Sequence, residues 1–460
     1  MRNTFRVLPV LLIITVAIIA PIIFSGYSEL KQAATAPSHL EAAQHDQTAA
    51  QRIPWRADLY ELAGHEYYYA KEYSLANTAY QKAFQRHALS AEGWVAWGDI
   101  NYLLKDPERA AEVWQQGLEQ ANPSESLYSR LAQIYQEKKD YSKAAEYLQR
   151  YSSTHLQDGS AHYRLGLLLT LTDPQAATSE LINASKLDPK LDPAVQTLRT
   201  ALNLASVSDT PSAKFVIIGR GLGLVSEWGL AQAAFEQATQ ADEKNAEAWA
   251  WLGEAYQQTD GTEALTVLDH ALSLNPNSAI VRGLRGLYFQ RIGNNREAFT
   301  EFQAAATLQP KDPSLYVSIG ESYSKLGDMI RALEAYQYAT SVAPDDLSYW
   351  RLLALFCAQN NIHLNDIGVP AAEHAVSIKA DDPVLQDTLG WVLLLNARYP
   401  EAERHLLRAL ELDSQNASAH FHLGVLYLQT DRQTLAQEQL ARARDLGSPD
   451  AQAMLNQYFP

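Results

Sequence analysis

The chain has 460 residues, more than one compact globular domain holds, so the sequence predicts several domains or an extended array. Its formal net charge of −16 repels phosphate backbones, which argues against nucleic acid as a partner. The single cysteine, Cys357, excludes an intrachain disulfide and any CxxC metal or redox motif. Alanine, leucine, glutamate and glutamine dominate, and this composition favours helix almost throughout.

The N-terminal segment, up to residue 56, predicts a membrane anchor followed by a spacer. Val7–Phe24 is an uncharged apolar run, long enough for a helix to cross the bilayer core. A cleaved signal peptide is the alternative, although its apolar region is normally shorter. Arg2 and Arg6 place residues 1–6 in the cytoplasm and the rest outside it, as a single-pass protein with a periplasmic or surface-exposed main part. Residues 25–56 are expected to be a juxtamembrane linker.

From residue 57 onward, one small residue returns with a period close to 34. Most successive spacings in this series equal that period, with longer steps after Gly166 and Ala354. The series is Gly64, Gly98, Ala132, Gly166, Gly219, Gly253, Gly286, Gly320, Ala354, Gly390 and Gly424. The same types of residue surround each member of the series. At Gly253, Trp249 and Leu252 come before the glycine and Tyr256 comes after it, followed by Ala264, Leu268, Ala271 and Pro276.

These copies resemble the tetratricopeptide-repeat family, whose W-x2-L-G-x2-Y…A-x3-F…A…P pattern they follow. The resemblance implies an all-α fold: a right-handed superhelix of about eleven helix pairs, here behind one N-terminal transmembrane helix. Each pair leaves an apolar face that only the next pair buries. Within this array we expect repeats 1–4 at residues 57–189, an inserted helix or degenerate half-repeat at 190–211, repeats 5–11 at 212–447 and a capping helix at 448–460.

The resemblance also implies that partners bind the first helix of each pair, on the concave face. In repeats 1 and 2 these positions form an acidic, tyrosine-rich strip, suited to a basic or aromatic segment. In the last two repeats they form an apolar strip, which binds a partner or is covered by Leu455, Tyr458 or Phe459 from the chain's own end. The predicted binding residues are Asp58, Glu61, His65, Tyr68, Tyr69, Asp99, Tyr102, Asp387, Trp391, Leu394, Leu395, Phe421, Val425 and Leu428.

No catalytic motif, cofactor site or metal site is expected. Gly219-Arg220-Gly221-Leu222-Gly223 imitates a phosphate loop, but it follows no predicted strand. His420 and His422 are two positions apart, so a helix directs them to different faces. We therefore expect a non-enzymatic interaction scaffold or assembly factor tethered to the membrane, which binds other proteins or peptides and no small-molecule substrate. The alternative is an accessory, non-catalytic subunit of a membrane enzyme or export complex.

Overall fold

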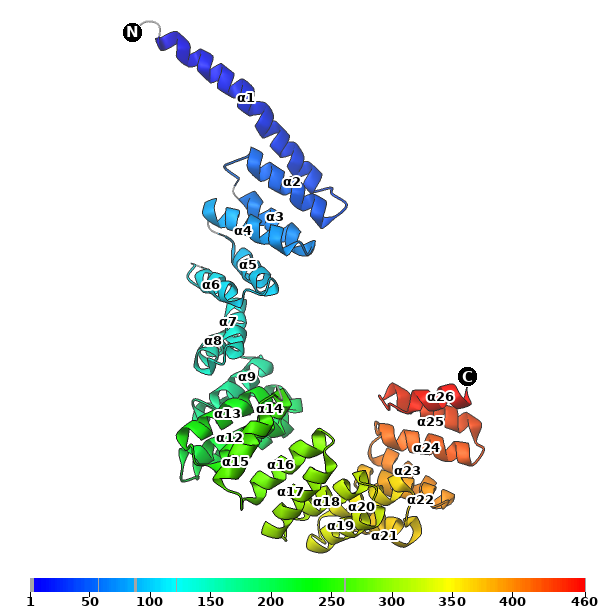
Figure 1. Cartoon of the computed structure of the whole chain (residues 1–460). Helices are drawn as coiled ribbons and strands as arrows, with labels where there is room; N and C mark the ends of the chain where they lie inside the picture. Colours follow the sequence, from blue (N-terminus) through cyan, green and yellow to red (C-terminus); the bar gives the residue numbers. More distant parts are fainter. Residues whose placement is uncertain (1–3, 57, 87–88, 121, 260–261, 460) are drawn as a thin grey trace. The chain divides into compact units, whose positions relative to one another are not determined.

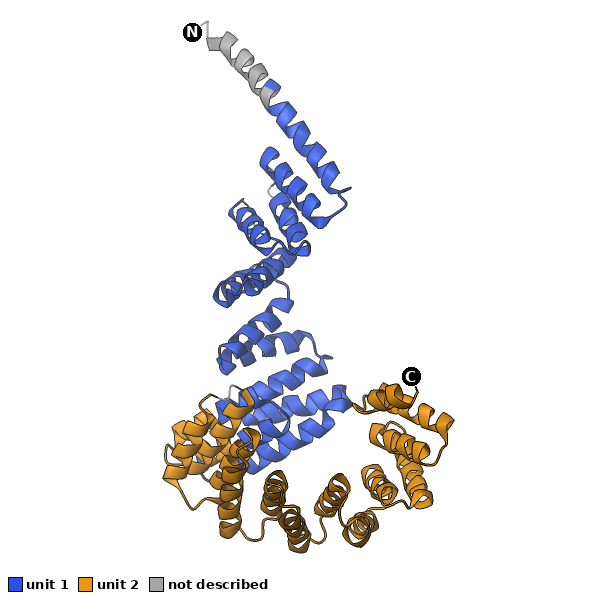
Figure 2. Ribbon diagram, turned by 45° about the vertical axis from the view of Figure 1, so that its right-hand side comes forward, with its two compact units in different colours: residues 1–210, 217–234 blue, residues 211–216, 235–460 orange. Residues whose placement is uncertain are grey.

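The computed structural model describes residues 4–56, 58–86, 89–120, 122–259 and 262–459; the side chains of residues 4–16 and 18 lie outside the description. Within these ranges the chain is entirely helical, with 26 α-helices and no strand (Figure 1). Two compact units divide it (Figure 2). Unit 1 comprises residues 1–210 and 217–234, and unit 2 comprises residues 211–216 and 235–460, so the boundary passes through α12 and α13.

Unit 1 begins with two helices that precede the repeats and continues with four helix pairs and a single extra helix. The first two helices are α1 (Thr4–Ala33) and α2 (His39–Arg52). The pairs are α3 (Asp58–Tyr69) with α4 (Tyr73–Arg86), α5 (Ala91–Leu103) with α6 (Pro107–Leu118), α7 (Ser126–Glu137) with α8 (Tyr141–Thr154), and α9 (Gly159–Leu169) with α10 (Pro174–Leu187). A 3₁₀ turn, Pro189–Leu191, then leads into the single helix α11 (Asp192–Ser206).

Seven further pairs and a last short helix follow. They are α12 (Pro211–Leu224) with α13 (Trp228–Ala241), α14 (Ala246–Thr259) with α15 (Ala264–Leu274), α16 (Ala279–Arg291) with α17 (Asn295–Leu308), α18 (Pro313–Lys325) with α19 (Met329–Val342), α20 (Leu347–Asn360) with α21 (Val369–Ile378), α22 (Pro383–Leu395) with α23 (Tyr399–Leu412), and α24 (Ala417–Gln429) with α25 (Gln433–Asp445). A π-helical turn, Leu364–Gly368, precedes α21, and α26 (Ala451–Tyr458) ends the chain's described part. The first helix of each pair is called helix A here, and the second is called helix B.

The recurring glycine lets the two helices of a pair approach closely. A Cβ atom at Gly98 would overlap Nε1 of Trp114, and one at Gly390 would lie 2.6 Å from Cγ of Leu406. In both pairs the obstructing side chain comes from helix B. Packing at this density leaves no room for a methyl group at Gly98 or Gly390, and every position of the series holds glycine or alanine.

The turn between the two helices is also periodic. Seven positions after the small residue, the backbone adopts the left-handed conformation, with positive φ. The residues that do so are Lys71, Lys105, Lys139, Ser226, Gly293, Gly327, Asn361, Ala397 and Asp431. Helix B then begins with a capping side chain in several pairs: the carboxylates of Asp106 and Asp140 accept hydrogen bonds from the backbone N–H of Arg109 and Lys143.

The predicted membrane anchor is not supported. Val7–Phe24 falls within α1, and most of its side chains lie outside the described residues. No helix among the described residues is both long enough and apolar enough to cross a bilayer, and the described part of α1 runs on into Ser25, Glu29 and Lys31. The prediction of a single-pass membrane protein, with a cytoplasmic N-terminus and an exported repeat region, is therefore wrong by this finding.

The segment expected to be a spacer, residues 25–56, forms the end of α1 and the helix α2, which pack against each other. Ala43 and Ala49 of α2 are fully buried, and Ile53 lies 2.6 Å from the position of a Cβ atom at Gly26. The Glu29 carboxylate of α1 joins the two helices, since it lies 2.6 Å from Nδ1 of His45 and 2.8 Å from Nη1 of Arg52. The hydrogen bond from His45 and the nearby Arg52 outweigh partial burial and hold the pKa of Glu29 below its usual range.

Candidate functional site

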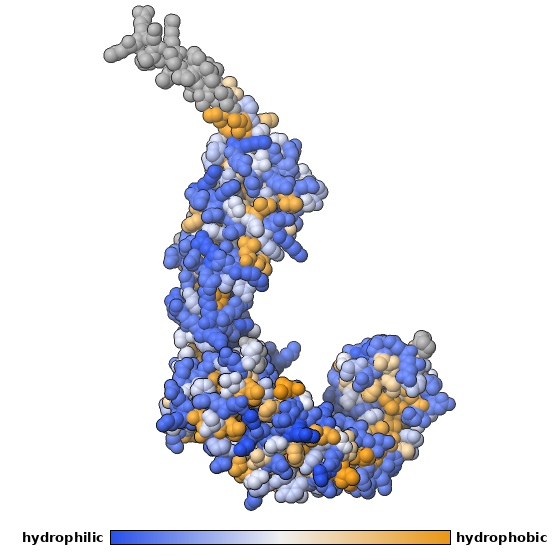
Figure 3. Space-filling model, viewed as in Figure 1, coloured by the Kyte–Doolittle hydropathy of each residue, from blue (hydrophilic) through white to orange (hydrophobic). Residues whose placement is uncertain are grey.

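Helices A of the first repeats line a continuous hollow in unit 1. Its largest part is a pocket of about 490 Å³ to which α3, α5, α7 and α9 all contribute. The polar and aromatic residues that line it are Tyr68, Asp99, Tyr102, Trp114, Ser129, Arg130, Gln133, Gln136, Tyr151, Asp158, Ser160 and Arg164. On the face shown in Figure 3, hydrophilic residues cover most of the helices and apolar residues form small separate patches. We call this hollow, together with the pockets that adjoin it, the A-helix groove.

An ion pair crosses the floor of the groove between consecutive repeats. Arg130 of α7 donates from Nε to Oδ1 of Asp99 at 2.5 Å and from Nη2 to Oδ2 at 2.8 Å. The hydrogen bond to Asp99 raises the pKa of Arg130, although burial opposes it. Beside this pair, the Tyr102 hydroxyl donates to the Glu137 carboxylate at 2.8 Å, and Gln133 donates to the same oxygen at 3.0 Å. These bonds fix the side chains that a ligand would meet.

A second pocket of about 300 Å³ adjoins the first and shares Tyr68 and Asp99 with it. His65, Tyr68 and Tyr69 line it from α3, and the Tyr69 side chain is 61% exposed. Burial, and secondarily the Asp99 charge, raises the pKa of Tyr68. The structure thus brings five of the predicted binding residues together in adjoining pockets: His65, Tyr68, Tyr69, Asp99 and Tyr102.

The other two predicted residues of this strip lie elsewhere. Glu61 is 8% exposed and accepts hydrogen bonds from the backbone N–H and hydroxyl of Ser90, the residue that caps α5. Despite its burial, hydrogen bonds from His65 and Ser90 hold the pKa of Glu61 below its usual range. Asp58 is exposed and pairs with Arg56, whose Nη2 lies 2.7 Å from Oδ2. Glu61 therefore connects the first two repeats, and Asp58 pairs locally.

Several groove residues were not predicted, although the repeat period identifies them. Adding 34 to Asp99 and Tyr102 gives Gln133 and Gln136, which line the same pocket. Arg130 and Arg164 also differ by 34 and occupy the same place in repeats 3 and 4. Carrying the register of repeats 1 and 2 forward would have found the glutamines. The two arginines could be identified only from the structure, because the equivalent residues in repeats 1 and 2, Leu62 and Ala96, are not charged.

The predicted apolar strip of the last repeats lies against the core of unit 2. Leu394 is 5% exposed, and the half-buried Trp391, Leu395, Val425 and Leu428 pack on the same cluster. Phe459, from the chain's end, packs on that cluster as well. Asp387 is 6% exposed and lies 2.7 Å from Nδ1 of His422. The His422 ring stacks on Trp391 and tilts towards Phe421. A binding role for this strip remains a prediction.

The residues that resemble a phosphate loop or a metal site pack against, or form hydrogen bonds with, other helices of the chain. Gly221 lies inside helix α12, where a Cβ atom would overlap that of Ala201. His420 lies 2.6 Å from Oε1 of Gln439, whereas His422 lies against Asp387, so the two rings bond to different helices. Across the part of the chain that is described, no group of three or more His, Cys, Asp or Glu residues could hold a metal ion.

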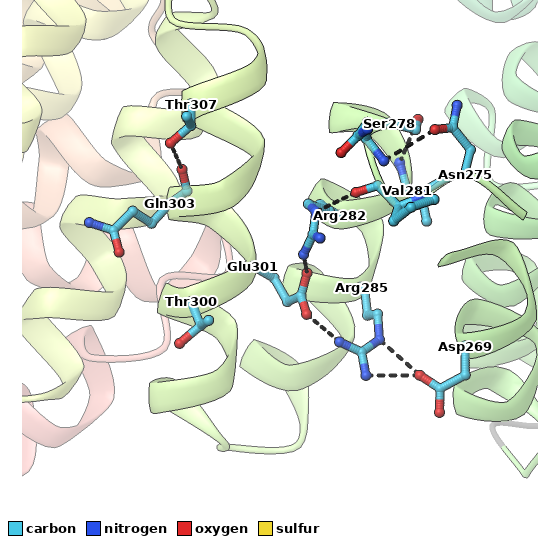
Figure 4. A network of polar contacts seen from close by, with 12 residues as sticks. Asp269, Asn275, Ser278, Val281, Arg282, Arg285, Thr300, Glu301, Gln303 and Thr307 are labelled. Carbon is cyan, nitrogen blue, oxygen red and sulfur yellow. Dashed lines mark hydrogen bonds and ion pairs between the residues drawn. The ribbon is translucent and has the colours of Figure 1, made fainter. Parts of the chain in front are cut away.

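Unit 2 contains a polar network in which the charges pair with one another (Figure 4). The Glu301 carboxylate of α17, 8% exposed, faces Arg282 and Arg285 of α16; Arg282 Nη1 lies 3.1 Å from Oε2. Arg285 also reaches back to α15, with Nη2 2.8 Å from Oδ1 of Asp269. The network joins three successive helices, so these arginines support the stack of repeats.

Comparison with known proteins agrees with this architecture. Profiles described as tetratricopeptide repeat match residues 62–126, 125–153, 254–313 and 313–346, and one described as TPR repeat matches residues 396–431. The chain is a tetratricopeptide-repeat protein. Such repeats generally mediate protein–protein interaction or assembly.

One similar curated protein is anaphase-promoting complex subunit 3 of Schizosaccharomyces pombe. It is 27% identical over 153 residues, which make up 33% of this chain and 23% of that protein. The chain therefore matches about a quarter of the length of this relative.

Solved structures with related helical stacks show low identity. The Cut9–Hcn1 heterotetramer aligns with a TM-score of 0.40 and 14% identity over 97% of this chain and 90% of that chain. Yeast Tom70 aligns with a TM-score of 0.42 and 14% identity over 96% of both chains. A tetratricopeptide-repeat protein of Parabacteroides merdae aligns with a TM-score of 0.43 and 13% identity over 54% of this chain and 99% of that chain. Scores at this level carry no functional conclusion.

Proposed function

We propose that this protein is a non-catalytic interaction scaffold or assembly factor, which holds an extended segment of a partner protein in the A-helix groove of unit 1. The single observation that carries the proposal is the continuity of the groove over four successive helices A, with side chains held in place by the Asp99–Arg130 pair. A preorganised groove loses little entropy on binding, and its tyrosines offer rigid contact area.

The proposal can be tested with the purified full chain and a phage-displayed library of random peptides. The wild-type protein should enrich a related family of peptides, because one groove with fixed side chains selects one register. Tyr102→Ala removes a ring that lines the groove and should abolish most of that enrichment. Tyr458→Ala removes a 48% exposed tyrosine from α26 and serves as the matched control. Equal enrichment by Tyr102→Ala and the wild-type protein would contradict the proposal.

A second candidate is a non-catalytic subunit of a stable multiprotein complex. It is favoured by the similarity to a curated protein that is itself named as a subunit of such a complex. Purification of the tagged chain under native conditions separates the two candidates by stoichiometry. One partner at a near-equal ratio supports a dedicated subunit, whereas several substoichiometric partners support a scaffold or assembly factor.

A further inference from the structure

The A-helix groove ends in a small pocket with a single carboxylate inside. This pocket has a volume of about 130 Å³, and Gln136, Arg164 and Leu168 line both it and the larger pocket, so the two hollows are continuous. The residues found only in the small pocket are Tyr163, Leu167, Glu227 and Leu230. All of them belong to unit 1. We call it the Glu227 pocket.

Glu227 occupies a place in its repeat where other repeats carry a capping aspartate. It lies eight positions after Gly219, as Asp106 lies eight positions after Gly98. The Asp106 carboxylate is occupied, because it accepts a hydrogen bond from the backbone N–H of Arg109 at 3.0 Å. Among the described residues, no group forms a hydrogen bond or ion pair with the Glu227 carboxylate. The longer side chain instead lines the pocket.

The surroundings of Glu227 disfavour an unpaired charge. Leu167, Leu168 and Leu230 are each less than 5% exposed and form apolar walls. Burial raises the pKa of Glu227, and the Arg164 charge only partly offsets the effect. Arg164 Nη2 donates to Oε1 of Gln136 at 2.9 Å, which ties the guanidinium to α7. A cation from outside would thus remove an electrostatic penalty that Arg164 compensates only in part.

The charges along the groove favour a basic ligand over an acidic one. Its three pockets are lined by four carboxylates, those of Glu92, Asp99, Asp158 and Glu227, and by two guanidinium groups, those of Arg130 and Arg164. Arg130 and Asp99 pair with each other, which leaves the carboxylates of Glu92, Asp158 and Glu227 and the guanidinium group of Arg164. A long basic side chain matches the pocket in two ways: its methylene groups can pack on the leucines and Tyr163, and its charge can reach the carboxylate.

We propose that the Glu227 pocket anchors one lysine or arginine side chain of the partner segment, with Glu227 as its counter-ion. The inference rests on the proposed function, because the anchored residue belongs to the segment that lies in the A-helix groove. It assigns that partner a chemical class: an extended segment that carries a basic residue where the groove meets the Glu227 pocket.

The test compares full-length wild-type protein with Glu227→Gln in selections from the same random peptide library. Wild-type protein should enrich peptides with lysine or arginine at one fixed position. In Glu227→Gln this preference should fall about tenfold or more, since a charge-assisted hydrogen bond is lost. Norleucine in place of the selected basic residue should weaken binding to the wild-type protein to the same degree, and have little effect on Glu227→Gln.

Two further variants separate a specific pairing from a general change in charge. Glu112→Gln removes an exposed carboxylate from α6, outside the groove lining, and should keep the basic preference. Glu227→Lys should select aspartate or glutamate at the same peptide position. The thermal unfolding midpoint of Glu227→Gln should not fall, because a neutral amide replaces a half-buried charge, and this checks that the variant folds.

The outcomes distinguish the inference from the function on which it rests. Enriched peptides without a basic residue, or the same basic preference in wild-type protein and Glu227→Gln, would overturn the Glu227 pairing and leave groove binding intact. Acidic peptides that depend on Arg164, and are lost in Arg164→Ala, would overturn it as well. If the wild-type protein enriches no peptide family, both proposals fail.

Discussion

Arg130 and Asp99 form a two-point ion pair between neighbouring repeats, with contacts of 2.5 and 2.8 Å. Both side chains are mostly buried, at 31% and 22% exposed. Asp99→Asn leaves the guanidinium without its counter-charge and should lower the free energy of unfolding by about 1–3 kcal/mol. Urea unfolding measures the loss, and hydrogen exchange in peptides of α5 and α7 should locate it.

The matched control for this pair is the exposed pair of Arg109 and Glu112 on one helix, whose contact is 2.8 Å. Solvent screens that pair, so Glu112→Gln should change stability by no more than about 0.5 kcal/mol. Equal losses in Asp99→Asn and Glu112→Gln would mean that the groove's ion pair contributes nothing beyond its surface counterpart.

Because of Asp46 in α2, the free energy of unfolding should fall as the pH rises. The side chain is 3% exposed; burial, reinforced by the Glu66 charge and partly offset by His45, raises its pKa to about 6. Between about pH 4 and pH 6 the folded chain retains a proton that the unfolded chain has lost, so folding weakens across this window. Asp46→Asn should flatten the profile and raise stability at pH 7 by up to about 3 kcal/mol.

Thermal unfolding at pH 5 and pH 7, followed by circular dichroism, checks this expectation. Glu41→Gln on the exposed face of the same helix should keep the wild-type profile. A wild-type protein that is more stable at pH 7 than at pH 5, by an amount that Asp46→Asn removes, would reverse the assigned sign.

Two glycines of α16 should respond to alanine in opposite directions. At Gly286 a Cβ atom would lie 2.6 Å from the Phe302 ring, so Gly286→Ala should destabilise the protein by about 1–3 kcal/mol. At Gly283 the nearest atom is Cδ2 of Leu315 at 3.8 Å, so Gly283→Ala should stabilise by about 0.5–1 kcal/mol through helix propensity. Urea unfolding of both variants measures the contrast, and a Gly286→Ala variant as stable as the wild-type protein would refute the close approach of α16 and α17.

Cys357 should be unreactive in the folded chain. The residue is fully buried in α20, and burial, with a smaller effect of Asp366, raises the pKa of its thiol to about 11. Because the thiolate is the nucleophile, iodoacetamide at pH 8 should label it only after unfolding. Ser377→Cys in a Cys357→Ala background supplies an exposed thiol that should react at once. Rapid labelling of the native wild-type chain would contradict the packing of α20.

The repeat itself could be predicted from the sequence because its cause is local and recurrent. Helix A needs a small residue where it meets a large side chain of helix B, such as Trp114 or Leu406. The same requirement applies in each copy, so a small residue recurs about every 34 positions. The five clustered residues of the candidate site followed from that register. Glu61 was assigned to the groove by the same reasoning, yet its contact with Ser90 depends on how the next repeat is placed.

Other features of the structure do not follow the repeat period and could not be predicted from it. Helix α2 packs through alanines and through the Glu29 contacts with His45 and Arg52, so its sequence lacks a strong apolar face. The Glu227 pocket joins residues from distant parts of the chain, and only the fold brings Tyr163 near Glu227. The apolar run at Val7–Phe24 predicted a membrane span from composition alone, and that prediction is not supported among the described residues.

The turns between helices A and B differ in backbone strain. Lys71, Lys105 and Lys139 adopt a left-handed conformation that costs a residue with a side chain about 1–2 kcal/mol, whereas Gly293 and Gly327 adopt it without that cost. The turns within the pairs from α3 to α8 are therefore under backbone strain, and the turns within the pairs from α16 to α19 are not. Local opening of the backbone should therefore begin at the lysine turns, at the ends of the helices that bear the groove, before it begins at the glycine turns.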